Sequence, residues 1–186
     1  NLEPRVGLRF QLRSDQSLKL SYNRMVQNTH LIAAGTIPLP FNTWSPSGYY
    51  LKPQIADQIA AGYFRNIKDN AYEGSVEVYY KDVNNVTDFA DNAEIMLNTN
   101  LSTEYRQGDA WAYGAEFMVN KKEGRLTGMV SYTWSKSMRK IDGVNNGKEF
   151  YASYDRRNVV NLTAAYELNP RWTFGGTFTY STGRPL

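Results

Sequence analysis

The stretch 28–53 gathers aromatic side chains whose chemistry suits ligand binding. Phe41, Trp44, Tyr49 and Tyr50 lie there among several prolines. Aromatic rings on a proline-stiffened loop stack on sugars or other flat ligands and lose little conformational entropy in doing so. The same residues suit the aromatic girdle of a membrane protein, or packing of the loop on its neighbours, and the pattern favours this second interpretation.

A second candidate is the adjacent pair Arg156 and Arg157, which follows Asp155. Guanidinium groups bind carboxylates and phosphates, including those of lipopolysaccharide, through paired hydrogen bonds. The alternative is an ion pair inside the protein, with Glu149 or Asp155 as the acid. With these alternatives open, the loop candidates for ligand binding are Trp44, Tyr49, Tyr50, Arg156 and Arg157.

Metal binding and catalysis find little support in the residue types. His30 is the only histidine and cysteine is absent, so a metal would depend on carboxylates. Asp88, Asp91 and Glu94 lie close in sequence, but their spacing does not match a calcium-binding loop, and a solvated loop face is favoured. His30 is expected as a polar residue at an outer strand end. Because hydrolase, metalloprotease and phosphate-loop motifs are also missing, we predict no enzyme, no metal site and no cofactor.

The elements that would position these residues are strands with one apolar face. In the segment 72–80, the even positions Tyr72, Val76, Val78 and Tyr80 are apolar or aromatic, whereas the odd positions up to 77 are polar. The segments 5–12 and 171–180 alternate in the same way. A period of two over about ten residues is typical of a β-strand that crosses a membrane.

The composition agrees with strands that meet lipid on one face only. The chain has 186 residues with 14 Tyr, 8 Phe and 4 Trp, yet its mean hydropathy is −0.57. It contains no apolar run long enough for a membrane helix. Its net charge of +3 is spread along the sequence, so we do not predict nucleic-acid binding.

Eight strands are predicted, joined alternately by tight turns and long loops. Short turns rich in Asp, Asn, Gly, Ser and Pro join the strands in pairs, and the long connections are 28–53, 84–109 and 138–156. This rhythm predicts an all-β protein, an antiparallel transmembrane β-barrel segment with tight turns in the periplasm and long loops outside. The predicted strands are 3–13, 17–27, 54–66, 71–83, 110–121, 125–137, 157–168 and 171–182.

The same rhythm places both ends of the chain on the extracellular side. A complete small barrel normally has both ends in the periplasm, so we expect 1–186 to be part of one larger barrel domain with further strands on both sides. We expect Val76, Val78, Leu162 and Phe174 to face lipid, and Trp134 and Trp172 to belong to the aromatic girdles. The residues expected on the charged inner face are Arg5, Arg9, Glu73, Glu77, Glu116 and Glu167.

Several segments resemble the barrel of TonB-dependent outer-membrane receptors, in particular the SusC-like class of Bacteroidetes. The resemblance implies a barrel of 22 strands, filled by a plug domain, that imports a scarce ligand with energy relayed through TonB. Neither a plug nor a TonB box occurs in this sequence. The similar segments are EPRVGLRF at 3–10, LSYNR at 20–24, LKPQIADQ at 51–58, VEVYYK at 76–81, GAEF at 114–117, SYTWS at 131–135, YDRR at 154–157 and TGRP at 182–185.

The resemblance implies uptake of a siderophore, cobalamin, a glycan or a peptide across the bacterial outer membrane. The implied partners are the lipid bilayer with its lipopolysaccharide, the plug domain, the TonB complex and a surface lipoprotein. One alternative is a non-transporting outer-membrane barrel or adhesin whose long loops bind a surface partner. Another is a soluble β-sandwich that binds carbohydrate through Trp44 and Tyr49, which would bury the apolar face between two sheets.

Overall fold

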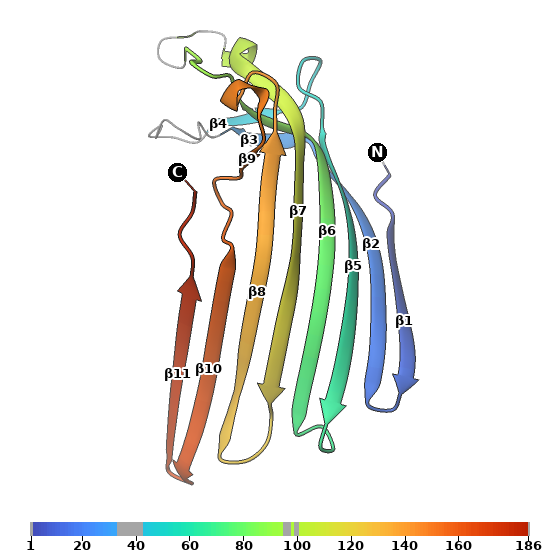
Figure 1. The fold of residues 1–186 in the computed structure, drawn as a ribbon, viewed down its shortest axis with the longest axis vertical. Helices are drawn as coiled ribbons and strands as arrows, with labels where there is room; N and C mark the ends of the chain where they lie inside the picture. The colour runs from blue at the N-terminus through green and yellow to red at the C-terminus, as the bar shows by residue number, and fades with distance from the viewer. Residues whose placement is uncertain (1, 33–42, 95–97, 99–100, 186) are drawn as a thin grey trace.

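The computed structural model describes residues 2–32, 43–94, 98 and 101–185, and most of these form one long antiparallel sheet (Figure 1). Its strands lie side by side in chain order, with only the short β9 (Phe150–Tyr151) off this path, paired with β8. The other eight strands of the sheet are β1 (Arg5–Arg13), β2 (Gln16–Gln27), β5 (Gln54–Ile67), β6 (Tyr72–Phe89), β7 (Tyr105–Lys121), β8 (Leu126–Lys140), β10 (Asn158–Asn169) and β11 (Trp172–Ser181).

The remaining elements all lie in the long connections. A separate two-stranded sheet consists of β3 (Thr29–Ile32) and β4 (Thr43–Pro46). Two short 3-10 turns, η1 (Leu101–Glu104) and η2 (Asn145–Gly147), lie in the second and third long connections. None of the helical segments that the structure describes is long and apolar enough to cross a membrane.

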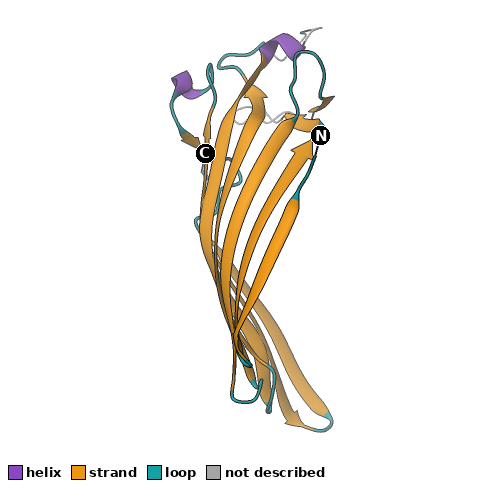
Figure 2. Cartoon of the chain, turned by 90° about the vertical axis from the view of Figure 1, so that its right-hand side faces the viewer, coloured by secondary structure: helices purple, strands orange, loops and turns teal. Residues whose placement is uncertain are grey.

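Each predicted strand overlaps one long strand of the sheet, so the prediction of an antiparallel all-β fold is confirmed. The prediction missed β3, β4 and β9. It also ended β6 several residues too early, at 83, and began β7 several residues too late, at 110. The sheet forms a single curved layer (Figure 2). Because no second large sheet covers it among the described residues, the sandwich alternative is wrong.

The strand register gives the sheet one apolar face. Residues directly opposite one another on paired strands point to the same side, so the apolar face can be followed from strand to strand. Val76 is opposite Tyr63 on one side and Phe117 on the other. From β1 to β11, the full row is Phe10, Leu18, Tyr63, Val76, Phe117, Tyr132, Val160 and Tyr180.

The opposite face is polar and charged. One residue further along β6, Glu77 is opposite Glu116, and the same row begins with Arg9 and Lys19 on β1 and β2. The register places all six residues expected on the inner face on this side. Val76, Val78, Leu162 and Phe174 lie on the apolar side and are all exposed, as expected for side chains that meet hydrocarbon.

Tight turns lie at one end of the sheet and long connections at the other (Figure 1). Lys68, Asp69 and Asn70, between β5 and β6, all have positive φ angles of 53–74°, and Gly124, between β7 and β8, has φ of 92°. Asp, Asn and Gly tolerate this left-handed conformation, which suits Asp69, Asn70 and Gly124 to the tight turns. We call the opposite end, where the long connections lie, the loop end.

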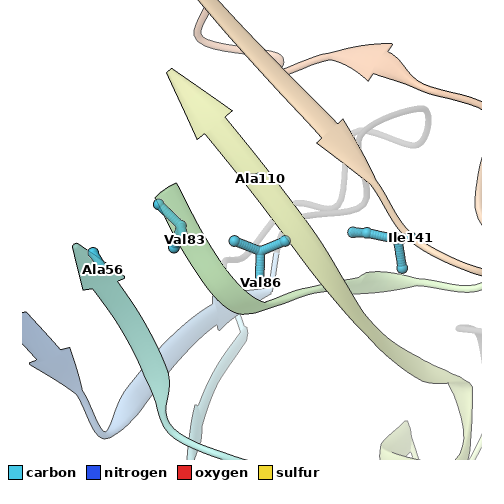
Figure 3. Close-up of a cluster of buried hydrophobic side chains, with 5 residues drawn as sticks. All are labelled: Ala56, Val83, Val86, Ala110 and Ile141. Atoms are coloured by element: carbon cyan, nitrogen blue, oxygen red, sulfur yellow. The ribbon is translucent and has the colours of Figure 1, made fainter. Parts of the chain in front are cut away.

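The main buried apolar cluster lies at the loop end. Ala56, Val83, Val86, Ala110 and Ile141 pack together there (Figure 3). Ile141 is fully buried, and it comes from the long connection after β8. The sheet is therefore a bare layer over most of its length and acquires a core only where the loops cover it.

Candidate ligand-binding surface at the loop end

At the loop end, β6 and β7 continue beyond their neighbours as a two-stranded extension. We define this extension as 86–89 of β6 with 105–108 of β7, which are paired in register. Just before it, Asn85 is an extra residue in β6 with φ of 62°. Such a bulge moves the following side chains to the other face. Val86 and Asp88 therefore lie on the polar side of the sheet, and Thr87 and Phe89 lie on the apolar side.

The described parts of the first long connection, 28–32 and 43–53, pack on the apolar side of the extension. The buried His30 ring lies between two hydroxyl groups, with its Nε2 atom 3.0 Å from Ser47 Oγ and its Nδ1 atom 3.2 Å from Thr87 Oγ1. Gln107 accepts a hydrogen bond from the Lys52 backbone N–H at 3.0 Å and donates one to the Lys52 carbonyl at 2.9 Å. These contacts attach 43–53 to the two extended strands.

His30 lies near the start of the short strand β3 at the loop end, and the sequence did not indicate that it would be buried there. Its side chain is only 2% exposed. Burial lowers the pKa of the imidazole, and a hydrogen bond with the backbone of Lys52 partly opposes this effect. The ring is a neutral structural group at the centre of the contact between β3 and β6.

The third long connection packs on the polar side of the same extension. Arg139 forms an ion pair with Asp88, with 3.2 Å between Nη1 and Oδ2, and its guanidinium lies 5.5 Å from the Tyr154 ring centroid. Asp155 accepts a hydrogen bond from the Ser137 N–H at 2.7 Å. The expectation of a solvated face at Asp88 is wrong, because this carboxylate is buried against a guanidinium.

Asp91 joins the second and third long connections. Its two carboxylate oxygens accept hydrogen bonds from the backbone N–H groups of Asn145 and Asn146, each at 3.0 Å. These bonds lower the pKa of Asp91. Glu94 is exposed and does not take part. Within the described part of the chain, no three His, Cys, Asp or Glu residues are arranged to hold a metal ion.

The aromatic candidates lie exposed on the first connection. Trp44 is 61% exposed, Tyr49 93% and Tyr50 85%. Tyr49 and Tyr50 contact each other edge to face, with ring centroids 5.0 Å apart. The loop that carries these rings is fixed at both ends by the hydrogen bonds around His30 and Lys52, so the rings stand on an ordered support. Phe41 lies outside the described residues.

The arginine candidates belong to the third connection and are separate from the aromatic ones. Arg157 forms an ion pair with Asp155, with 3.5 Å between Nη2 and Oδ2, and its guanidinium lies 5.2 Å from the Tyr151 ring centroid. This is the internal ion pair that the sequence offered as the alternative. Arg156 is exposed. The extension separates the two candidate groups, because their connections pack on its opposite faces.

Sequence reasoning missed Thr87, Gln107 and Arg139, which hold the two connections in place. The available signal was residue type and not alternation, because Val86, Thr87, Phe89 and Tyr105 are β-branched or aromatic residues that favour strands. The many Asn and Asp residues in 84–109 instead favour the prediction of one loop.

The polar face of the sheet carries charges that face one another. Glu77 and Glu116 are directly opposite on β6 and β7, and Arg9 and Lys19 are directly opposite on β1 and β2. Within the described residues, neither glutamate forms an ion pair. Like charges that face each other repel. The polar face is therefore suited to contact a surface that places basic groups against the glutamates and acidic groups against Arg9 and Lys19.

The apolar face has a groove of about 480 Å³. Its lining includes Leu8, Leu20, Ala61 and Val78, which lie in one row of the register. The groove lies on the apolar face, which the sequence predicts to meet hydrocarbon, so we do not include it among the candidate sites for a soluble ligand.

Three solved structures share this fold over almost the whole chain. The structure of a complex of FpvAI with pyocin S2 has a TM-score of 0.65 at 16% sequence identity, covering 94% of this chain and 22% of that one. The FrpB iron transporter from Neisseria meningitidis has a TM-score of 0.65 at 15% identity, with coverages of 95% and 26%. P. aeruginosa FpvA in a complex with heterologous pyoverdine and Fe has a TM-score of 0.64 at 14% identity, with coverages of 96% and 25%.

The chain thus spans about a quarter of the length of these proteins. A comparison with curated proteins finds no significant match. The family model described as "TonB dependent receptor-like, beta-barrel" matches residues 1–185. This match covers nearly every strand, turn and loop described above, and the chain belongs to the TonB-dependent receptor β-barrel family.

Proposed function

We propose that the chain is part of the wall of a bacterial outer-membrane receptor that imports a scarce ligand with energy relayed through TonB. The observation that carries this proposal is the two-faced sheet. One face presents an unbroken apolar row across eight strands, and the adjacent row on the other face carries the charged residues Arg9, Lys19, Glu77 and Glu116 on four of these strands. A wall between hydrocarbon and a plugged, polar lumen needs this arrangement.

The proposed partner on the polar face is a plug domain. Glu77 and Glu116 attract basic groups, whereas Arg9 and Lys19 attract acidic ones. We therefore expect the plug to present Lys or Arg to β6 and β7, and Asp or Glu to β1 and β2. In the full receptor, the double substitution of Glu77 and Glu116 by Gln should loosen the plug, measured as faster hydrogen exchange in the plug than in wild type.

The proposed ligand surface is formed by the exposed Trp44, Tyr49 and Tyr50, with Arg156 on the opposite side of the extension. Ferric chelates are the first ligand class to test, because the names of two structural neighbours include iron, and cobalamin, glycans and peptides follow. If the receptor is of the SusC-like subtype, a surface lipoprotein should co-purify with it from the outer membrane.

The test is uptake by cells that carry the full receptor as their only route for the ligand. A labelled ferric chelate should accumulate, and dissipation of the proton gradient should abolish accumulation while leaving binding intact. Binding that never leads to uptake, with any of the four ligand classes, would instead support the alternative of an adhesin or non-transporting barrel. Full-length protein that is soluble without detergent would contradict the membrane location.

The aromatic surface has a matched control within the chain. Trp44 and Trp172 are both 61% exposed, but Trp44 is at the loop end and Trp172 is next to a tight turn. Each of Trp44→Ala, Tyr49→Ala and Tyr50→Ala should weaken ligand binding by about 5- to 30-fold, the usual effect of removing a stacked ring. Trp172→Ala should leave affinity unchanged, and equal losses at both ends would exclude direct contact.

A further inference from the structure

We propose that His30 is the centre of a pH-responsive clasp, which holds the segment 43–53 on the β6–β7 extension when the imidazole is neutral and releases this segment when the ring is protonated. The clasp consists of His30 and Ser47 from the first long connection, with Thr87 and Gln107 from the extension. Its action does not depend on which ligand the receptor carries or on whether that ligand is imported.

Both nitrogens of the His30 ring face hydroxyl groups, which can donate or accept. On the neutral ring one nitrogen donates a hydrogen bond and the other accepts one. Protonation turns the accepting nitrogen into a second donor, so the hydroxyl that donated to it must rotate and accept instead. Thr87 Oγ1 also lies 3.3 Å from Gln107 Nε2, so a change at this hydroxyl affects the contact with the extension.

Within the described residues, no carboxylate lies at ion-pair distance from the His30 ring. On β6, Asp88 points to the opposite face and pairs with Arg139. On β7, the ionisable groups on the same face as Gln107 are Tyr105, which hydrogen-bonds Ser45, and Asp109 near the bulge. The first connection itself contributes Lys52, a like charge. The ring's hydrogen-bond partners are thus neutral, and an imidazolium would be buried without an ion-pair partner.

The direction of the pH effect follows from burial. In the clasped state the pKa of His30 is lowered, chiefly by desolvation, whereas in the released state it has the ordinary value of about 6.5. The released state therefore binds protons more readily. The clasp is fully stable above the ordinary pKa, weakens as the pH falls through it, and stops weakening below the lowered pKa of the clasped state.

The released segment is the one that carries the aromatic rings. In the clasped state, the Ser47 N–H donates to Asn28 O at 2.7 Å, and the Lys52 N–H donates to the Gln107 side chain. Release of His30 would free both amides and move Tyr49 and Tyr50 away from their fixed support. Acidification would thereby change the position of the aromatic surface while the wall stays folded.

The experiment is hydrogen exchange of the full receptor in lipid nanodiscs at about pH 7.5 and about pH 5, converted to protection factors to remove the intrinsic pH dependence. Protection of the amides in 43–53 should fall by up to about 30-fold at the lower pH, the limit set by an ordinary histidine pKa in the released state. Protection across β5 should not change. Unchanged protection in 43–53 would overturn the proposal.

Two variants separate the titration of His30 from general acid sensitivity. His30→Gln keeps a donor and an acceptor but cannot be protonated, so its pH response should vanish. Ser47→Asp places a carboxylate beside Nε2 and stabilises the imidazolium, so acidification should no longer open the segment. If the segment 43–53 of the His30→Gln variant is already unprotected at about pH 7.5, the test depends on the Ser47→Asp variant alone. A pH response equal to that of the wild type in either variant refutes the clasp.

Discussion

The same strands are stabilised differently at their two ends. Toward the tight turns, the sheet is one layer whose large apolar residues, such as Val119, Val130 and Phe178, are about half exposed. Toward the loop end, side chains are covered by the chain itself. Every buried apolar residue described lies at or near that end, namely Leu51, Ala56, Val83, Val86, Phe89, Ala110, Met138, Ile141 and Ala152.

The difference reflects the medium around each region. Hydrocarbon is as apolar as the side chains that it covers, so the wall needs no protein core on its outer face. In the proposed receptor, the extension of β6 and β7 lies above the lipid and meets water, where a bare two-stranded ribbon is only marginally stable. The first and third long connections supply the missing layers, one on each face of the extension.

The largest expected effect is a loss of stability at the loop end, which we compare with the loss at an apolar residue of the bare part of the sheet. Ile141→Ala leaves a cavity in the cluster with Val86 and Ala110, and should destabilise the loop end by about 2–5 kcal/mol. Val130→Ala should lose about 1 kcal/mol or less, because lipid chains fill the space. Hydrogen exchange of the folded receptor in nanodiscs measures both effects, and equal losses would contradict the contrast.

The second prediction tests the assignment of the two faces with adjacent residues of β10. Leu162 lies on the apolar face and Thr163 on the polar face, and both are exposed. Leu162→Arg should reduce the free energy of membrane folding by about 2–4 kcal/mol if it lies near the midplane, whereas Thr163→Arg should have a much smaller effect. The measurement is denaturant-dependent folding into vesicles.

The third prediction compares ion pairs of the two ends. In the pair of Arg139 with Asp88, the side chains are 19% and 10% exposed, and in the pair of Arg65 with Asp15 they are 50% and 40% exposed. Arg139→Met leaves a buried carboxylate unpaired and should cost about 1–3 kcal/mol. Arg65→Met should cost less than about 1 kcal/mol. Thermal unfolding of the receptor in detergent compares the two, and a larger loss at Arg65 would refute the ranking.

The smallest effect is local and concerns Asp91. Its lowered pKa means that the bonds to Asn145 and Asn146 are complete above the ordinary pKa of an aspartate, and are lost as the pH falls through the lowered value. Asp91→Asn should speed exchange of these two amides at neutral pH and leave the wall strands unchanged. Amides that stay protected in the variant would show that other contacts hold the two connections together.

Much of the wall could be predicted from the alternation of residues. Segments such as 72–80 and 171–180 show a period of two that only a strand produces, and the pleat converts odd and even positions into two faces. The loop end was harder, because its packing depends on contacts between segments far apart in sequence. His30 and Thr87 are 57 residues apart, and no local pattern of the sequence indicates that they meet.

The sequence by itself determined the strands, their faces and the alternation of tight turns with long connections, since these follow from local periodicity and turn-forming residues. Only the tertiary structure decided which side chains at the loop end face outward. A single extra residue, Asn85, reverses the alternation in β6 but not in β7, so Thr87 and not Asp88 meets the first connection. The composition does not reveal one inserted residue, yet the insertion turns the side chain of every later residue in the strand to the opposite face of the sheet.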